Sequence, residues 1–143
     1  MMDREGIEAA LPHRDPFVMV DELVEVELRK RAVAIKRVRA DEDWARGHFP
    51  GNPVFPGVLL IEALAQTAAL CYLSDPEMAG KGVFLLGVEK MRFRKIVRPG
   101  DELRLEVTAT AEKRRIVFFD VEATVDGVRV ASGSIMATVE EER

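Results

Sequence analysis

The stretch GHFPGNPVFPGVLLIEALAQTAALCYLSD, residues 47–75, joins a loop rich in proline and glycine to the most apolar run of the chain, which Glu62 interrupts. Pro56 stands where a first helical residue is favoured, and good helix formers follow it for about five turns. The stretch therefore predicts one long helix. Because its apolar residues point in nearly every direction, we expect this helix to be buried on most sides.

Segments rich in valine, leucine and isoleucine lie on both sides of this helix. Residues 17–40 partly alternate between apolar and polar and predict two strands joined near Arg29–Arg31, after a short helix over residues 4–10 that Pro12 ends. Turns at Pro99-Gly100 and Asp126-Gly127 separate further strands in the second half, predicted over residues 83–97, 101–113, 115–125 and 128–140. The sequence predicts an α+β fold in which six antiparallel strands cover one apolar helix.

The composition fits one compact domain over residues 1–143, because 48% of the residues are hydrophobic and 32% are charged. A net charge of −4 argues against a general nucleic-acid binder. Cys71 is the only cysteine and only His13 and His48 accompany it, so we expect no intramolecular disulfide and no metal site. Cys71 is expected to be a small core residue. With neither a secretory signal nor an uninterrupted apolar run of ~20 residues, the sequence predicts a cytoplasmic protein with no membrane association.

Glu62 needs an explanation, because an unpaired charge in an apolar helix is costly. One interpretation is structural: Glu62 and Gln66, at i and i+4, form a narrow polar edge that reaches solvent. The other is chemical, because the stiff loop carries His48 only 14 positions before Glu62. The N–H groups near Gly57, at the start of the helix, also favour negative charge.

This combination suits proton abstraction next to a carbonyl. His48 can remove the α-proton, and N–H groups near Gly57 can hold the carbonyl oxygen as it becomes enolate-like. Glu62, kept protonated by apolar surroundings, can donate a proton to a leaving hydroxyl. The predicted result is loss of water.

Three stretches carry a resemblance to a known family: LPHRDPFVMVD, GHFPGNPVFPGVLLIEALAQ and FLLGVEKMRFRKIVRPGDELRLEV, which fall in order between residues 11 and 107. They resemble the (3R)-hydroxyacyl-[acyl-carrier-protein] dehydratases of bacterial type II fatty-acid synthesis, of the FabZ type. The resemblance implies a hot-dog fold, in which the sheet wraps the central helix. It also implies that His48 and Glu62 are the catalytic pair, that the amide of Gly57 polarises the thioester carbonyl, with Val58 beside it in the substrate site, and that Phe93 lines the acyl tunnel.

In this family, the histidine and the carboxylate of one site come from different subunits, which implies a homodimer and commonly a trimer of dimers. No metal or redox cofactor is implied, since the phosphopantetheine arrives on the acyl carrier protein. Basic residues around the predicted strand over 83–97 are either a solvated face of the sheet or a docking surface for this acidic carrier: Lys90, Arg92, Arg94, Lys95 and Arg98.

Two positions depart from the family pattern. Asp15 stands where an aromatic residue is usual, and Phe55 stands where methionine is common, which leaves the acyl chain length open. Glu62, where the isomerising relative has aspartate, favours dehydration alone, and His13 is expected to have a structural role. Two other functions remain as alternatives at this point: a hot-dog acyl thioesterase and a non-catalytic acyl-binding subunit.

Overall fold

The structure is a computed structural model in which residues 1–140 are described. A short helix, α1 (Arg4–Ala10), precedes the hairpin of β1 (Glu22–Glu27) and β2 (Arg31–Arg37). A 3-10 turn, η1 (Asp43–Arg46), leads to the long helix α2 (Gly57–Leu73). The remaining strands are β3 (Val83–Phe93), β4 (Glu102–Lys113), β5 (Ile116–Val125) and β6 (Val128–Val139).

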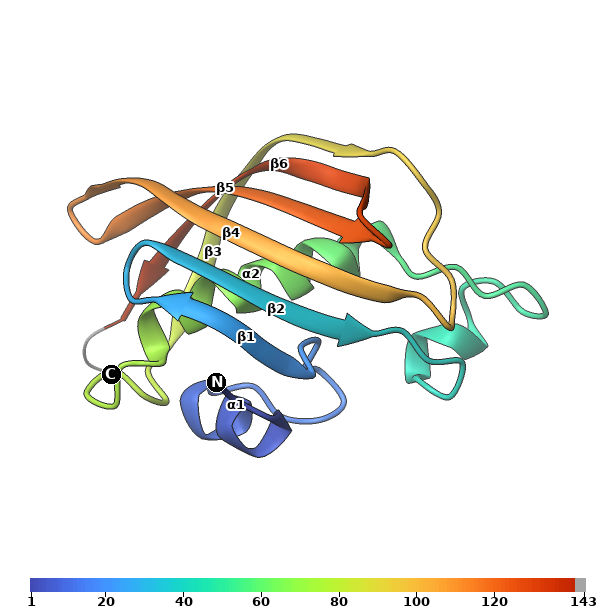
Figure 1. Cartoon of the computed structure of the whole chain (residues 1–143), viewed down its shortest axis with the longest axis horizontal. Coiled ribbons are helices and arrows are strands. Elements are labelled where there is room, and N and C mark those ends of the chain that lie inside the picture. Colours follow the sequence, from blue (N-terminus) through green and yellow to red (C-terminus); the bar gives the residue numbers. More distant parts are fainter. Residues whose placement is uncertain (141–143) are drawn as a thin grey trace.

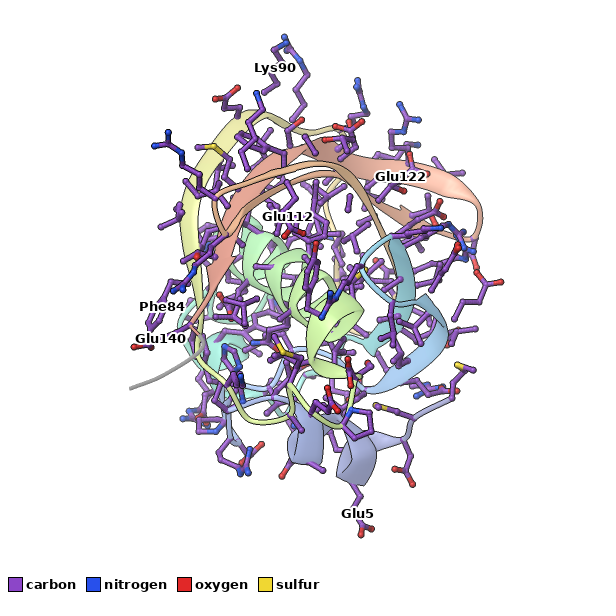
Figure 2. All side chains as sticks on the ribbon, turned by 90° about the vertical axis from the view of Figure 1, so that its left-hand side faces the viewer. Glu5, Phe84, Lys90, Glu112, Glu122 and Glu140 are labelled. Atoms are coloured by element: carbon purple, nitrogen blue, oxygen red, sulfur yellow. The ribbon has the colours of Figure 1, made fainter. Side chains whose placement is uncertain are left out.

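The strands form one antiparallel sheet of six strands in the order β1-β2-β4-β5-β6-β3. The sheet curves around α2, as the views along and across the helix show (Figures 1 and 2). This is the hot-dog arrangement, so the predicted fold class is confirmed. Since β3 joins the sheet only through β6, β3 and β1 are the two edge strands.

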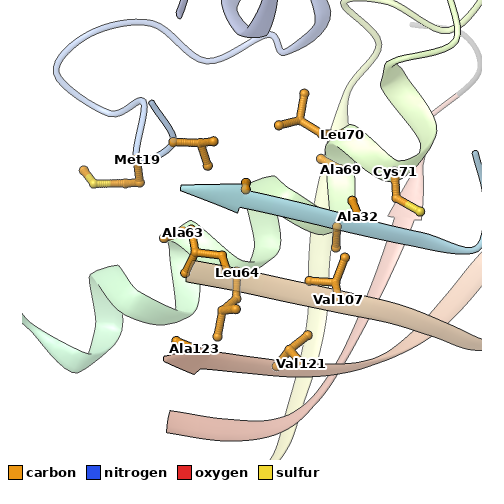
Figure 3. Packing of buried hydrophobic residues seen from close by; sticks show 14 of the residues in the cluster. Met19, Ala32, Ala63, Leu64, Ala69, Leu70, Cys71, Val107, Val121 and Ala123 are labelled. Carbon is orange, nitrogen blue, oxygen red and sulfur yellow. The ribbon is translucent and has the colours of Figure 1, made fainter. Parts of the chain in front are cut away.

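The core lies between α2 and the concave face of the sheet. Leu64 and Ala63 of the helix face Val107, Val121 and Ala123 of the sheet (Figure 3), and all five residues are at most 4% exposed. Burying a large aliphatic side chain contributes about 1.5–3 kcal/mol. The predicted alternation along β4 is also confirmed, because its buried positions are Leu103, Leu105 and Val107.

Cys71, near the end of α2, is fully buried, and burial raises the pKa of its thiol to about 11. Its expected place in the core is confirmed. Across residues 1–140, no helix combines the length and the apolar character needed to span a membrane.

Several boundaries differ from the expectation, most of them by one residue. Pro56 has an extended backbone (φ −62°, ψ 136°) and is the N-cap, so α2 begins one residue later, at Gly57. The segment between the second strand and the long helix, for which no element was predicted, contains η1, which is too short to leave a periodic signal. The strand expected over residues 83–97 ends at Phe93.

A β-bulge between Glu89 and Arg92 also interrupts the expected alternation near the end of β3. Lys90 lies inside the bulge with a left-handed backbone (φ 55°) and projects away from the sheet (Figure 2). Because a bulge adds an unpaired residue to one strand, the period of two does not continue through it.

Candidate active site

His48 lies on the loop between η1 and α2, where two hydrogen bonds tie it to Val54. The backbone N–H of Val54 donates to the carbonyl of His48 (2.8 Å), and the imidazole Nδ1 lies 2.7 Å from the carbonyl oxygen of Val54. A carbonyl oxygen only accepts hydrogen bonds, so Nδ1 carries a proton. In the neutral ring, Nε2 is then the unprotonated nitrogen, which is the atom a general base requires.

The pocket beside His48 has a volume of about 330 Å³ and includes the start of α2. Gly57 and Phe93 line it together with Arg94 and Lys95. A Cβ atom on Gly57 would lie 3.0 Å from Cζ of Phe93, so glycine lets the aromatic ring lie directly against the helix. The structure thus brings together His48, Gly57 and Phe93, three residues that the sequence analysis assigned to one site.

The first turn of α2 has no side-chain cap, because Pro56 offers none. The N–H groups of Leu59 and Leu60 both donate to the carbonyl of Pro56 (3.0 Å each). The N–H groups of Gly57 and Val58 precede these bonds and lack intrahelical acceptors. They are suited to an oxygen that gains negative charge at the positive end of the helix dipole. Val58 itself is 74% exposed.

Glu62 is held by Gln66, which lies one turn further along the same face of α2. The Gln66 amide Nε2 donates to Oε2 of Glu62 (2.8 Å) and to the carbonyl of Phe17 (2.8 Å), while its Oε1 accepts from the N–H of Met19 (2.8 Å). The backbone bond to Oε1 fixes which end of the amide faces Glu62. Because Oε2 of Glu62 is engaged, Oε1 is the oxygen that can exchange a proton with a ligand.

Glu62 and Gln66 therefore form a polar pair, but only Glu62, whose side chain is 21% exposed, reaches solvent as one interpretation predicted. Gln66 is only 1% exposed, and its partners are the backbone of the segment before β1. His13 also approaches this pair, with Nε2 lying 3.4 Å from Oε2 of Glu62. No pattern in the sequence indicated that this histidine, expected to be structural, lies within reach of Glu62.

Glu62 and His48 line different pockets of the chain. The small pocket at Glu62, about 40 Å³, also includes His13, Val83 and Leu85, so it lies beneath the beginning of β3. The His48 pocket instead includes Phe93, at the end of β3. The two residues that the sequence paired are thus separated along the edge strand, with Glu62 near its start and His48 near its end.

The five basic residues considered for docking are all exposed, but they differ in surroundings. Arg94 and Lys95 line the His48 pocket. Arg98 bonds to Asn52 through its side chain and to Asp101 through its backbone N–H, so it supports the loop after His48. Among the two departures from the family pattern, Phe55 is buried and lines the His48 pocket, whereas Asp15 lies at a different pocket near α1.

The Gln66 bonds can be tested by unfolding. We expect Gln66→Leu to lower the free energy of unfolding by about 1–3 kcal/mol, because the buried N–H of Met19 loses its acceptor. Thr67→Val is a matched control at the next position, since it removes only a bond to the carbonyl of Ala63 within the helix, and should cost less. Urea titrations compare the two variants. If Gln66→Leu lowers the free energy of unfolding no more than Thr67→Val does, the expected contribution of the Gln66 bonds to stability is wrong.

Comparisons with known proteins show which family the chain resembles. The model of the FabA-like domain matches residues 11–134. A 3-hydroxyacyl-[acyl-carrier-protein] dehydratase FabZ from Herpetosiphon aurantiacus is 48% identical over 97% of this chain and 99% of its own length. A protein of the same name from Chloroflexus aggregans is 51% identical over 87% of each chain.

Among solved structures, the dehydratase heterocomplex ApeI:P from Xenorhabdus doucetiae superposes with a TM-score of 0.82 at 18% identity, covering 95% of this chain and 91% of that one. At this identity the match supports the fold alone. The family model and the FabZ relatives, which match nearly the whole chain, carry the assignment. The chain belongs to the FabZ family of 3-hydroxyacyl-[acyl-carrier-protein] dehydratases.

Proposed function

We propose that His48 and Glu62 perform the acid–base chemistry by which this chain, a hydro-lyase of fatty-acid synthesis, converts (3R)-3-hydroxyacyl-[acyl-carrier-protein] to the trans-2-enoyl product. The single observation that carries the proposal is the bond from His48 Nδ1 to the carbonyl of Val54, which leaves Nε2 free as a base. The proposal needs no metal or redox cofactor, because each step is a proton transfer or the cleavage of a carbon–oxygen bond.

In the proposed reaction each of these groups has one task. Nε2 of His48 takes the proton from C2 of the acyl group while the N–H groups of Gly57 and Val58 bind the thioester oxygen, which gains charge. The electron pair left at C2 forms the double bond to C3 as the C3–O bond breaks. Protonated Glu62 gives its proton from Oε1 to the departing hydroxyl, which leaves as water. Return of the proton from His48 to Glu62 through solvent resets the site.

We further propose that one site is built from two copies of the chain, joined at β3. This edge strand exposes large apolar side chains, among them Phe84 (47% exposed; Figure 2), Leu85 (42%), Leu86 (49%) and Val88 (39%). An exposed apolar edge is a template for pairing with another strand. The other edge, β1, is partly covered, because Met2 pairs with Leu23.

Antiparallel pairing of two β3 strands around a twofold axis accounts for the separation of His48 and Glu62. Val88 lies midway between Val83 and Phe93, so a twofold axis near Val88 sets the start of one β3 beside the end of the other. The Glu62 pocket of one protomer would then meet the His48 pocket of its partner. This reasoning supports a homodimer as the working unit, and a trimer of dimers remains a prediction, as does a cytoplasmic location.

The acyl carrier protein is proposed to dock on the basic surface formed by Lys90, Arg92, Arg94, Lys95 and Arg98. The support comes from position, because Arg94 and Lys95 lie at the pocket that holds His48. A carrier bound there delivers its phosphopantetheine arm over a short path. Exposed charges of this kind mainly steer and orient the encounter.

Turnover tests the assigned roles. We expect His48→Ala and Glu62→Gln each to lower kcat about 10²–10⁴-fold, because each removes a proton-transfer group. Enoyl absorbance during turnover gives kcat, and circular dichroism checks the fold. A folded His48→Ala variant that dehydrates its substrate at the wild-type rate would refute the assignment.

Charge reversal tests the docking surface. We expect the double variant Arg92→Glu/Lys95→Glu to raise KM for carrier-bound substrate while sparing a small thioester analogue, and added salt to mimic the effect, since charges are screened over about 8–10 Å at physiological ionic strength. Lys113→Glu/Arg114→Glu, at the exposed turn between β4 and β5, is the matched control. Unchanged carrier kinetics would place docking elsewhere, and equal losses on both substrates would assign Arg92 and Lys95 to the tunnel or the fold.

A further inference from the structure

The ion pair between Lys36 and Glu42 is unusual because it is buried. Lys36 Nζ donates to Oε1 of Glu42, and the two side chains are 3% and 11% exposed. Within residues 1–140, Lys36 is the only charged residue that is buried. By contrast, the next residue, Arg37, forms an ion pair with Glu22 that is open to solvent. A buried pair is costly to desolvate, so its presence calls for a role beyond stability.

Glu42 is held at the start of η1 by its own backbone and by its second carboxylate oxygen. Oε2 accepts from the N–H of Arg39 (2.8 Å), and the carbonyl of Glu42 accepts from the N–H of Ala45 (3.0 Å). The carboxylate therefore joins three parts of the chain: β2 through Lys36, the residues just after β2, and η1. Movement of η1 relative to the sheet has to break this ion pair.

The 3-10 turn in turn holds His48. The N–H of His48 donates to the carbonyl of Trp44 (3.0 Å). The Trp44 ring packs edge-on against Phe55, with centroids 5.2 Å apart, and Lys36 Nζ lies 6.0 Å from the Phe55 centroid. Phe55 directly follows Val54, the residue that accepts from Nδ1 of His48.

Lys36 thus supports His48 from two directions. One route runs through Glu42 and Trp44 to the backbone of His48, and the other runs through Phe55 to the carbonyl that fixes the imidazole. We propose that the Lys36–Glu42 ion pair is a positioning device for His48, which keeps Nδ1 bonded to Val54 and Nε2 aimed at the substrate. The proposal rests on the role of His48 as the base given above. Lys36 and Glu42 touch no reacting atom in this account.

The first test is Lys36→Met, which keeps most of the side-chain volume and removes the charge. We expect kcat to fall about 10- to 100-fold, because a small misplacement of a reacting group has effects of this size. KM should stay within about twofold. The imidazole should change as well: 15N NMR of the wild-type protein should show the neutral His48 ring with its proton on Nδ1, and the variant should show a mixture of both tautomers. The His48→Ala spectrum assigns the signals.

The double variant Lys36→Met/Glu42→Gln separates an effect on positioning from an effect on stability. The same measurements can be made on it if Lys36→Met alone fails to fold. It leaves no unpaired buried charge, so its melting temperature should return toward the wild-type value. Since the link between β2 and η1 is still missing, kcat and the tautomer signal should remain altered. Recovery of kcat together with stability would overturn the proposal, as would an unaltered kcat and tautomer signal in either folded variant.

Tyr72→Phe is the control for a general loss of stability. It removes the bond from the Tyr72 hydroxyl to Glu112 (2.7 Å) at the far end of α2, so it should lower stability and leave kcat unchanged. A fall in kcat in this variant equal to that in Lys36→Met would also overturn the proposal. Failure of the proposed function can be told apart from failure of this inference. If His48→Ala keeps its turnover, the assignment of His48 as the base is wrong. The tautomer signal of His48 in Lys36→Met still shows whether the ion pair positions the imidazole.

Discussion

The need to enclose α2 is the constraint on which the rest of the structure depends. This helix is apolar in nearly every direction, and burying it on one face only would leave much of its surface in water. The sheet therefore curves around it, and α1 contacts it from another side. A sheet that wraps one helix without closing on itself leaves two edges, and the exposed one is β3. The open edge at β3 is thus a direct consequence of how the helix is covered.

Glu62 is tolerated in this helix because neighbouring polar groups contact its carboxylate. Gln66 is held by two backbone groups and offers an N–H to one carboxylate oxygen, and His13 approaches the same oxygen. The other oxygen, Oε1, takes part in neither contact. His48 is treated in the same way, since the loop occupies one ring nitrogen and leaves the second. In both residues one polar atom is fixed by the protein, so the remaining atom has a defined direction.

Much of this was predictable from the sequence, because the strong signals are local. The period of two along β4, the Asp126-Gly127 turn and the long apolar run gave six strands and one helix with nearly correct limits. The residues themselves suggested roles for His48, Glu62 and Gly57, and the resemblance to the dehydratases implied the same roles, which stay predictions. The contacts of His13 with Glu62 and of Lys36 with Glu42 were not predictable, because each joins segments whose spatial relation only the folded chain defines. The bulge at Lys90 was missed for a similar reason, since it reflects pairing with β6 and leaves no mark in the pattern.

The central claim is that His48 of one protomer works with Glu62 of its partner. Mixing the inactive variants His48→Ala and Glu62→Gln under conditions of subunit exchange tests it most directly. A mixed dimer has one site with both native residues and one site with neither, and random exchange of equal amounts makes half of the dimers mixed. The account predicts recovery of about a quarter of the wild-type dehydration rate. No recovery, after mass spectrometry has verified mixed dimers, would contradict it and place His48 and Glu62 of each site within one chain.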